Sequence, residues 1–405
     1  MNRSSIYRNI IDFKRSKGSY LFDKRNGNRL LDFFGQYATL TLGYNHPIFK
    51  TSTYLNEIAN VAHQKISNCE LFSDESTEFD ISFRNFTCGS NFTHYHYACT
   101  GALAIEAAVK TSIDYKGPGY DRVISFKKSF HGINGYGGFL TDKFSPVNLR
   151  LDGFPSASWD RVINPIVHYE NNLAVINEEL VQSVLSNVES IITTKNNVCA
   201  ILVEPIQCTF GDRYFPTNFF TGLRRLADQY DIPLIFDEIQ VGFCVTGKIW
   251  YHNHLSVKPD IIVFGKKTQL SGIAVQKKFT DIFNQAIRLE VTWDADIMDM
   301  IRCKHIIKAI KDGDILGNVN NMSDLLLRGL SRIECIENIR HCGLLFAFDL
   351  ATKKQRDLLF YEMKKRSMLC NPTGDKTIRL RPNLCVTKEE INHALSIMAK
   401  ASKKI

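Results

Sequence analysis

The chain has 405 residues, of which 44% are hydrophobic and 23% are charged. This is the composition of a globular protein, and it excludes a disordered chain, a collagen and a coiled coil. The 50 Lys and Arg residues against 42 Asp and Glu give a net charge of +8 that is spread along the chain, so we expect no nucleic-acid partner. The densest basic run, residues 364–366, is typical of a solvated helix face.

The N-terminal residues and the cysteines favour a cytoplasmic location. Charges at Arg8, Asp12, Lys14 and Arg15 interrupt the stretch in which a secretory signal would need an apolar core. The 11 cysteines are scattered, and no two have the C-x-x-C spacing, which favours a reducing compartment and no metal site. No apolar run approaches the roughly 20 residues that a membrane-spanning helix needs. We therefore expect a soluble cytosolic protein with no membrane partner.

A β-hairpin is predicted near the N-terminus. Residues 20–23 and 29–34 are rich in apolar side chains, and they flank the Asn-Gly-Asn sequence at 26–28, which is a hairpin turn signal. Such a hairpin has too little core to be stable alone, so it must pack against another part of the chain.

A helix over residues 101–115 is predicted next, with Thr100 as its N-cap. Its first turn holds the small residues Gly101 and Ala102, so backbone N–H groups there would be open to an anion. The positive end of a helix dipole favours a phosphate at this place. A plain capped helix is the alternative.

The middle of the chain alternates short apolar runs with amphipathic stretches. Runs of four or five residues that are apolar on both faces predict buried strands of a parallel sheet. Residues 217–230 have apolar side chains at helical spacing and predict a crossover helix between two of these strands. The strand candidates are residues 123–126, 199–203, 233–236 and 261–264.

The C-terminal third predicts a smaller α+β domain. Helical patterns cover residues 301–311 and 322–336, and a strand follows at 343–350. The large domain is expected to span residues 61–290, and the small domain to combine residues 1–60 with 291–405.

Two charged side chains stand at the ends of predicted strands, where open α/β sheets bind ligands. Asp237 ends one apolar run, and its carboxylate needs a cationic partner such as a protonated ring nitrogen; a helix N-cap or a structural ion pair is the alternative. Lys266 follows the next run, where partial desolvation would favour a Schiff base with an aldehyde. Lys267 is the competitor, because one residue along a strand reverses the face, and the residues alone do not choose between them. Two solvated lysines at the end of a strand are the plain alternative.

Phe130 and His131 follow the strand at 123–126 and offer an aromatic or imidazole face on which a planar ring could stack. A core phenylalanine and a surface histidine are the plain alternative. Together with the helix start, the carboxylate and the lysine, these side chains supply what pyridoxal phosphate needs from a protein.

Five motif strings bring these features together: Glu-Pro-Ile-Gln at 204–207, Gly-Asp-Arg-Tyr-Phe at 211–215, Leu-Ile-Phe-Asp-Glu-Ile-Gln at 234–240, Pro-Asp-Ile-Ile-Val-Phe-Gly-Lys-Lys-Thr-Gln at 259–269 and Ile-Arg-Leu-Arg-Pro at 378–382. With them the chain resembles, over nearly its whole length, the class III aminotransferases of fold type I. Within that class it is most similar to the L-lysine 6-transaminases. The resemblance implies a fold-type I α/β transferase, with a mostly parallel sheet in the large domain and a smaller α+β domain.

The resemblance also implies pyridoxal 5′-phosphate as the cofactor. Lys266 matches the lysine that carries the cofactor as a Schiff base, Asp237 matches the partner of the pyridine nitrogen, and Phe130 would stack on the ring. The other residues expected at the cofactor are Gly101 and Ala102 at the phosphate, Gln240 near the phenolic oxygen, and His131 and Glu204.

Two further matches concern the subunit partner and the substrate. Thr292 matches the threonine that reaches the phosphate of the neighbouring subunit's cofactor, which implies a homodimer. Arg381 matches the arginine that binds a substrate carboxylate with two hydrogen bonds.

Three departures from the family pattern affect substrate recognition. Ile133 stands where the lysine transaminases have an arginine for the donor's α-carboxylate. In the segment where the family has Gly-Glu-Gly-Gly, this chain has Cys-Thr-Phe-Gly, so Thr209 replaces the glutamate and Phe210 a glycine. Asp294 and Asp296 replace uncharged residues near the place of a phosphate, where like charges would weaken binding if they faced inward.

The predicted function is transfer of the terminal amino group of lysine or a related amine to 2-oxoglutarate, giving a semialdehyde and glutamate. Another pyridoxal-phosphate reaction on the same fold, by an aminomutase or a decarboxylase, is one alternative. A catalytically silent homologue that serves as a structural partner is the other.

Overall fold

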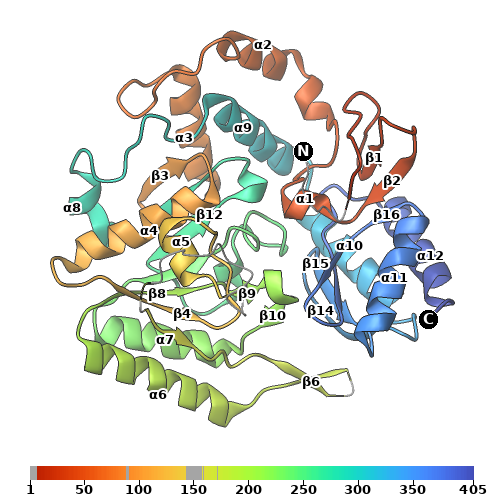
Figure 1. Ribbon diagram of the computed structural model, residues 1–405. Helices are drawn as coiled ribbons and strands as arrows, with labels where there is room; N and C mark the ends of the chain where they lie inside the picture. The colour runs from red at the N-terminus through yellow and green to blue at the C-terminus, as the bar shows by residue number, and fades with distance from the viewer. Residues whose placement is uncertain (1–6, 88–90, 143–156, 158, 171) are drawn as a thin grey trace. The chain divides into compact units, whose positions relative to one another are not determined.

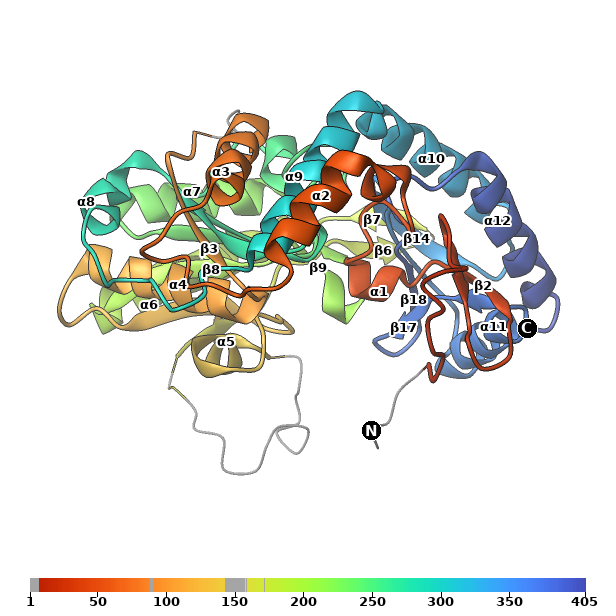
Figure 2. The ribbon, with the colours of Figure 1, turned by 90° about the horizontal axis from the view of Figure 1, so that it is seen from above.

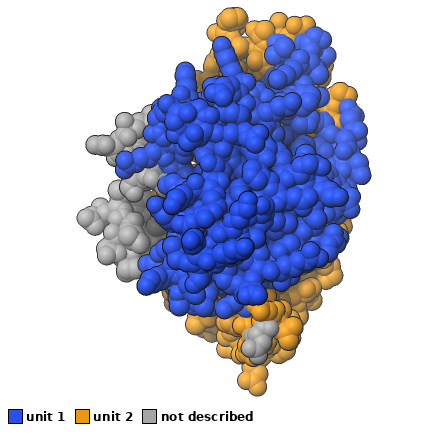
Figure 3. All heavy atoms as spheres, turned by 90° about the vertical axis from the view of Figure 1, so that its right-hand side faces the viewer, with its two compact units in different colours: residues 1–55, 309–405 blue, residues 56–308 orange. Residues whose placement is uncertain are grey.

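The structure is a computed structural model, and it describes residues 7–87, 91–142, 157, 159–170 and 172–405. The chain divides into two compact units (Figure 3). Unit 1 combines Met1–Leu55 with Ala309–Ile405, and unit 2 is Asn56–Lys308. The boundaries expected from the sequence lay at residues 60 and 290.

Unit 2 is built on a seven-stranded sheet. Strands β12, β11, β8, β4 and β5 run parallel, and β13 is antiparallel to both β12 and β3. Every residue of β8, β11 and β12 is buried, because these strands carry apolar side chains on both faces. The prediction of a mostly parallel sheet is confirmed. In spatial order the strands are β3 (His94–Ala98), β13 (Ser271–Val275), β12 (Ile261–Phe264), β11 (Leu234–Asp237), β8 (Val198–Val203), β4 (Arg122–Phe126) and β5 (Arg161–Val162).

Helices cover this sheet. Helix α4 packs against β8, β12 and β13, and its buried face is made of small and β-branched residues that let the helix approach the sheet closely. Helices α6 and α7 run side by side, and α7 contacts β11 (Figure 1). The helices that begin in unit 2 or cross its boundaries are α2 (Ser52–Val61), α3 (Asp74–Thr87), α4 (Gly101–Lys116), α5 (Gly135–Leu140), α6 (Glu178–Lys195), α7 (Thr217–Gln229), α8 (Thr280–Phe283) and α9 (Ile297–Asp312).

Two short hairpins complete unit 2, formed by β6 (His168–Glu170) with β7 (Leu173–Val175) and by β9 (Ile206–Gln207) with β10 (Arg213–Tyr214). Short 3-10 helices lie at Cys208–Phe210 and Lys266–Thr268. Within the described residues no helix is long and apolar enough to cross a membrane.

Unit 1 holds two small sheets. The predicted N-terminal hairpin is confirmed as β1 and β2, and β16 from the C-terminal part of the chain pairs with β2 and extends it. Helix α12 lies beside α10 and α11 (Figure 2). The strands are β1 (Tyr20–Phe22), β2 (Arg29–Asp32) and β16 (Met368–Leu369) in one sheet, and β14 (Glu337–Cys342), β15 (Leu345–Asp349), β18 (Thr377–Leu380) and β17 (Asn371–Thr373) in the other. The helices are α1 (Gly35–Ala38), α10 (Ile315–Leu330), α11 (Lys353–Lys365) and α12 (Lys388–Ser402).

Candidate active site

A cavity of about 210 Å³ lies in unit 2 at the ends of several sheet strands. Asp237 is the last residue of β11, and Lys266 follows β12 by two residues. Because the carboxyl ends of parallel strands meet at one edge of a sheet, the topology brings these side chains together. The predicted site residues that line the cavity are Gly101, Ala102, Phe130, His131, Glu204, Thr209, Asp237, Gln240 and Lys266.

The two adjacent lysines have different surroundings. Lys266 lines the cavity and has a φ of 55°, in the left-handed region. Lys267 is only 3% exposed, and its Nζ donates a hydrogen bond to the Gln240 carbonyl oxygen at 3.0 Å. The preceding Gly265 has no room for a side chain, since a Cβ there would lie 2.6 Å from Ser271 Oγ. The strand pattern alone did not decide whether Lys266 or Lys267 faces the cavity. The turn after β12 decides it, because it directs Lys266 to the cavity.

The Asp237 carboxylate is held by two hydrogen bonds. Its Oδ2 accepts from His131 Nδ1 at 2.8 Å, and its Oδ1 accepts from the Ile239 backbone N–H at 3.1 Å. A carboxylate can only accept, so Nδ1 carries the proton of the imidazole. The His131 backbone N–H donates to Thr141 Oγ1 at 2.8 Å, which fixes the other end of the residue. Within the described chain, the buried His131 Nε2 has no hydrogen-bond partner.

Glu204 and Gln207 fix the loop that carries Phe130. The Phe130 backbone N–H donates to Glu204 Oε1 at 2.7 Å, and the buried Gln207 side chain donates from Nε2 to the Lys127 carbonyl oxygen at 2.9 Å. Glu204 is 6% exposed, so its carboxylate is a buried acceptor for this loop. These bonds hold Phe130 in the cavity wall, whereas the His131 ring is engaged with Asp237.

The start of α4 offers unused hydrogen-bond donors. Thr100 caps the helix, with its Oγ1 accepting from the Leu103 N–H at 3.4 Å. The N–H groups of Gly101 and Ala102 form no hydrogen bond to any described residue, as expected in the first turn of a helix. A Cβ at Gly101 would lie 2.9 Å from Ile239 Cδ1, so a side chain there would crowd the cavity. The site therefore has anion donors, a held carboxylate and a lysine, which fit pyridoxal phosphate.

Three predicted residues lie outside this cavity lining. Ile133 is 60% exposed, and Thr292 is exposed on the segment that precedes α9. Arg381 belongs to unit 1, where it is buried directly after β18. Its Nη1 donates to the carbonyl oxygens of Phe346 and Leu380, both at 2.9 Å, and these bonds set the orientation of the guanidinium.

The two aspartates after Trp293 have separate partners. Asp296 forms an ion pair with Lys65 at 3.3 Å. Asp294 Oδ1 accepts from the Val291 N–H at 3.0 Å, and its own N–H donates to Asn68 Oδ1 at 2.8 Å. Burial raises the pKa of Asp294 to about 6. The Asp296 carboxylate is thus paired with a lysine, and the Asp294 carboxylate accepts a hydrogen bond within its own turn.

The sequence did not predict the apolar part of the cavity or a second cavity. Ile206, Ile239 and Val241 line the first cavity; the alternation of Ile239 and Val241 after β11 was the available signal.

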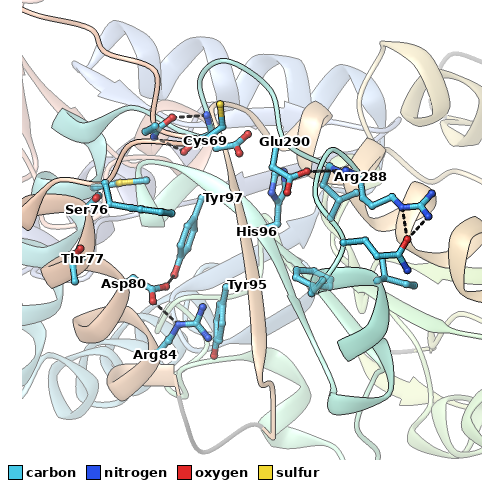
Figure 4. A pocket seen from close by; sticks show the side chains of 18 residues that line it. Cys69, Ser76, Thr77, Asp80, Arg84, Tyr95, His96, Tyr97, Arg288 and Glu290 are labelled. Carbon is cyan, nitrogen blue, oxygen red and sulfur yellow. Dashed lines mark hydrogen bonds and ion pairs between the residues drawn. The ribbon is translucent and has the colours of Figure 1, made fainter.

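A second cavity of about 370 Å³ lies between α3, β3 and the segment before α9 (Figure 4). Its polar groups bond to one another: Asp80 accepts from the Tyr97 hydroxyl at 2.7 Å and from Arg84 Nε at 2.6 Å. His96 lies beside Glu290, and burial lowers the pKa of His96 to about 4, so the ring is neutral near pH 7. None of the residues predicted at the cofactor lines this cavity.

The family model for aminotransferase class-III matches residues 3–402, and the chain therefore belongs to this family of pyridoxal-phosphate-dependent aminotransferases. The chain is 31% identical over 415 residues to the L-lysine-epsilon aminotransferase of Mycobacterium tuberculosis, which covers 97% of this chain and 91% of that protein. It is 29% identical over 427 residues to the 4-aminobutyrate aminotransferase of Dictyostelium discoideum, with 97% and 85% covered.

Solved structures agree with this assignment. The lysine aminotransferase from M. tuberculosis in the internal aldimine form matches with a TM-score of 0.91 and 29% identity, over 98% of this chain and 95% of that one. An amine transaminase from an uncultivated Pseudomonas species shares the fold, with a TM-score of 0.86, 20% identity, and 100% and 97% of the two chains covered. The fold-type I prediction and the prediction of a transaminase are confirmed.

Proposed function

We propose that the protein transfers the terminal amino group of lysine or a related amine to 2-oxoglutarate, giving a semialdehyde and glutamate. The observation that carries the proposal is that Lys266 and Asp237 line one cavity with the open N–H groups of α4. The names of the relatives, L-lysine-epsilon aminotransferase and 4-aminobutyrate aminotransferase, support an amine at the end of a chain.

Pyridoxal phosphate, when bound, supplies a ring that accepts electrons from the carbon bearing the donor nitrogen. In the proposed site Lys266 Nζ would hold the cofactor covalently until the donor amine replaces it there. The freed Lys266 amine would then take a proton from the carbon that bears the donor nitrogen. The N–H groups of Gly101 and Ala102 hold the phosphate, and Gln240 is assigned to the phenolic oxygen. Phe130 covers a face of the ring.

Asp237 holds positive charge on the ring nitrogen. His131 acts as a positioning residue, because its Nδ1–H fixes Asp237 Oδ2, while the Ile239 N–H fixes Oδ1. Both side chains are buried, so the carboxylate does not need to be reoriented or desolvated when the cofactor binds.

Arg381 is proposed to bind a carboxylate of 2-oxoglutarate with two parallel hydrogen bonds. The carbonyl oxygens of Phe346 and Leu380 already hold one of its nitrogen atoms, so the guanidinium loses little freedom on binding.

We also propose a cytoplasmic homodimer. Exposed apolar side chains gather on the segment before α9 and at the start of α4: Ile287 is 88% exposed, Val291 48%, Trp293 44% and Leu103 42%. The Cys99 thiol donates to the Trp293 carbonyl oxygen at 3.4 Å, which joins this segment to the start of α4. A second copy of the chain would cover this surface and bring Thr292 of the partner subunit to the phosphate.

The test is an amine panel with the purified holoenzyme. Lysine, ornithine, acetylated ornithine, 4-aminobutyrate and simple diamines are each supplied with 2-oxoglutarate, and glutamate and aldehyde are measured. We expect both products in equal amounts from at least one ω-amine. Release of carbon dioxide, formation of an isomeric amine, or no glutamate from any donor would contradict the proposal.

A further inference from the structure

Two cations lie over the ring of Phe210, next in the chain to a residue of the Lys266 cavity. Lys128 Nζ is 4.9 Å and Arg213 Cζ 4.7 Å from the centre of the Phe210 ring. Phe210 directly follows Thr209, which lines the cavity. Where the family has a glycine, this chain has Phe210. The aromatic ring over which both cations lie is therefore particular to this chain.

The fold holds this group of side chains in place. The Asn164 side chain donates from Nδ2 to both the Lys127 carbonyl oxygen, at 2.8 Å, and Gln207 Oε1, at 2.6 Å. These bonds join the loop before Phe130 to β9, and β10 places Arg213 opposite Gln207 in the hairpin. Lys128 has a φ of 62°, in the left-handed region that a lysine rarely adopts, and such conformations persist where the surrounding structure imposes them.

The charges nearby leave the Lys128 ammonium available. The Lys128 backbone N–H donates to Asp142 Oδ2 at 2.9 Å, so one carboxylate is close to its main chain. Asp212, next to Arg213, is completely buried. Lys128 Nζ makes no ion pair with a described residue, and it lies over the Phe210 ring. A lysine ammonium that lies over an aromatic face still has N–H groups that can donate to a ligand.

Among the described residues that line the cavity, no further lysine or arginine is present to bind a negative group on the donor. Of the residues that line it, Lys266 is assigned to the cofactor and His131 is bound to Asp237. The remaining wall includes the apolar side chains of Ile206, Ile239 and Val241. A donor with an apolar chain therefore fits the interior, and a charged end must leave it.

We propose that Lys128 and Arg213, held over Phe210, bind the carboxylate at the far end of the amino donor while the donor's amine reaches Lys266. This inference rests on the proposed function and defines its donor class: compounds in which an apolar chain separates the reacting amine from a carboxylate. Lys128 and Arg213 would supply the cationic contact that Ile133 cannot make.

The test compares two amines of one length with the holoenzyme. 6-Aminohexanoate carries the carboxylate, and hexylamine lacks it. We expect Lys128→Met and Arg213→Met each to lower kcat/KM for 6-aminohexanoate about tenfold through KM, since each tenfold is about 1.4 kcal/mol of binding. Hexylamine and the 2-oxoglutarate half-reaction should be unchanged, and Lys127→Met, which removes an exposed neighbouring charge, should behave as wild type. Equal losses for both amines, or no loss, would overturn the inference.

A binding measurement separates this inference from the proposed function. Isothermal titration calorimetry with hexanoate reports on the carboxylate site without turnover. Weaker hexanoate binding by both variants than by wild type supports the site even if no amine is converted, whereas equal binding by all three proteins overturns it.

Discussion

Lys266 and Lys267 are adjacent in the chain, and a shift of one residue decides which lysine lines the cavity. Both follow a buried strand, and both carry the same amine, yet one lines the cavity and the other is buried against a carbonyl oxygen. The sequence could predict that an amine would emerge here. It could not choose between them without the resemblance, because the choice depends on the left-handed conformation of Lys266 and on the close contact of Gly265 with Ser271.

Replacing Lys267 with Met tests this difference. The variant would lose the hydrogen bond from the Lys267 ammonium to the Gln240 carbonyl oxygen, and a hydrogen bond from a charged group contributes about 1.5–3 kcal/mol of stability. Chemical denaturation should show this loss, while the protein still takes up pyridoxal phosphate and keeps its yellow colour. Loss of the bound cofactor at unchanged stability would contradict the assignment of Lys267 as structural.

The raised pKa of Asp294 should make the stability of the protein depend on pH. Its pKa of about 6 in the folded chain lies above the ordinary aspartate value of 3.8, so the folded state holds the proton more strongly than the unfolded state. Stability should therefore fall as the pH rises from about 4 to about 6, and then stay level. Asp294→Asn keeps an acceptor for the Val291 N–H and should remove this fall, giving a protein that is more stable than wild type at pH 7.

The control for this change is Asp296→Asn, which removes the same charge but breaks the ion pair with Lys65. It should not stabilise the protein. Melting temperatures from pH 4 to pH 7 measure both variants, and an Asp294→Asn protein with the wild-type slope would show that the site does not disfavour the charged carboxylate.

Among the helices and strands, α4 is the one whose first N–H groups are proposed to hold the cofactor phosphate. Gly101→Val would place a side chain against Ile239, since even a Cβ would lie 2.9 Å from Ile239 Cδ1, and it would crowd the open N–H groups. We expect the dissociation constant for pyridoxal phosphate to rise at least tenfold, measured by equilibrium dialysis. Adding Ile239→Ala should recover part of the affinity; a double variant as weak as the single one would show that crowding is not the cause.

The elements that the sequence predicted best are the strongly periodic or continuously apolar ones. Helix α4 and strands β4, β8, β11 and β12 lie where the patterns placed them. Strands β3 and β13 were not predicted, because β3 alternates His and Tyr, and β13 begins with Ser and Gly, so neither is a continuous apolar run. Helix α10 begins seven residues before the pattern at 322–336, because Asp314 caps it by accepting from the Gly317 N–H.

More of the candidate site than of the sheet could be predicted from the sequence. Asp237, Lys266 and Glu204 each follow a predicted strand, and strand ends are readable from the sequence. The contact of His131 with Asp237 joins residues 106 positions apart in the chain, and no local pattern contains it. The cation pair over Phe210 is of the same kind, since it needs the β9–β10 hairpin and the loop after β4 to meet.

For the whole molecule, the role proposed for Thr292 of the partner subunit depends on the proposed homodimer. Ile287→Asp would place a charge in the exposed apolar segment, and we expect it to give a monomer near 46.2 kDa and to weaken cofactor binding. The control is Leu173→Asp, which changes an equally apolar, 70% exposed side chain on the β6–β7 hairpin. Sedimentation velocity should show a dimer for wild type and for the control, and a dimeric Ile287→Asp protein would place the interface elsewhere.

In the proposed function the Lys266 amine, which lines the same cavity as Asp237, carries the cofactor. The most direct measurement is peptide mapping by mass spectrometry after borohydride reduction of the yellow holoenzyme. We expect one phosphopyridoxyl group, on Lys266, in the peptide that spans residues 259–269. A label on Lys267 or on any other lysine, or a protein that takes up no cofactor, would contradict it.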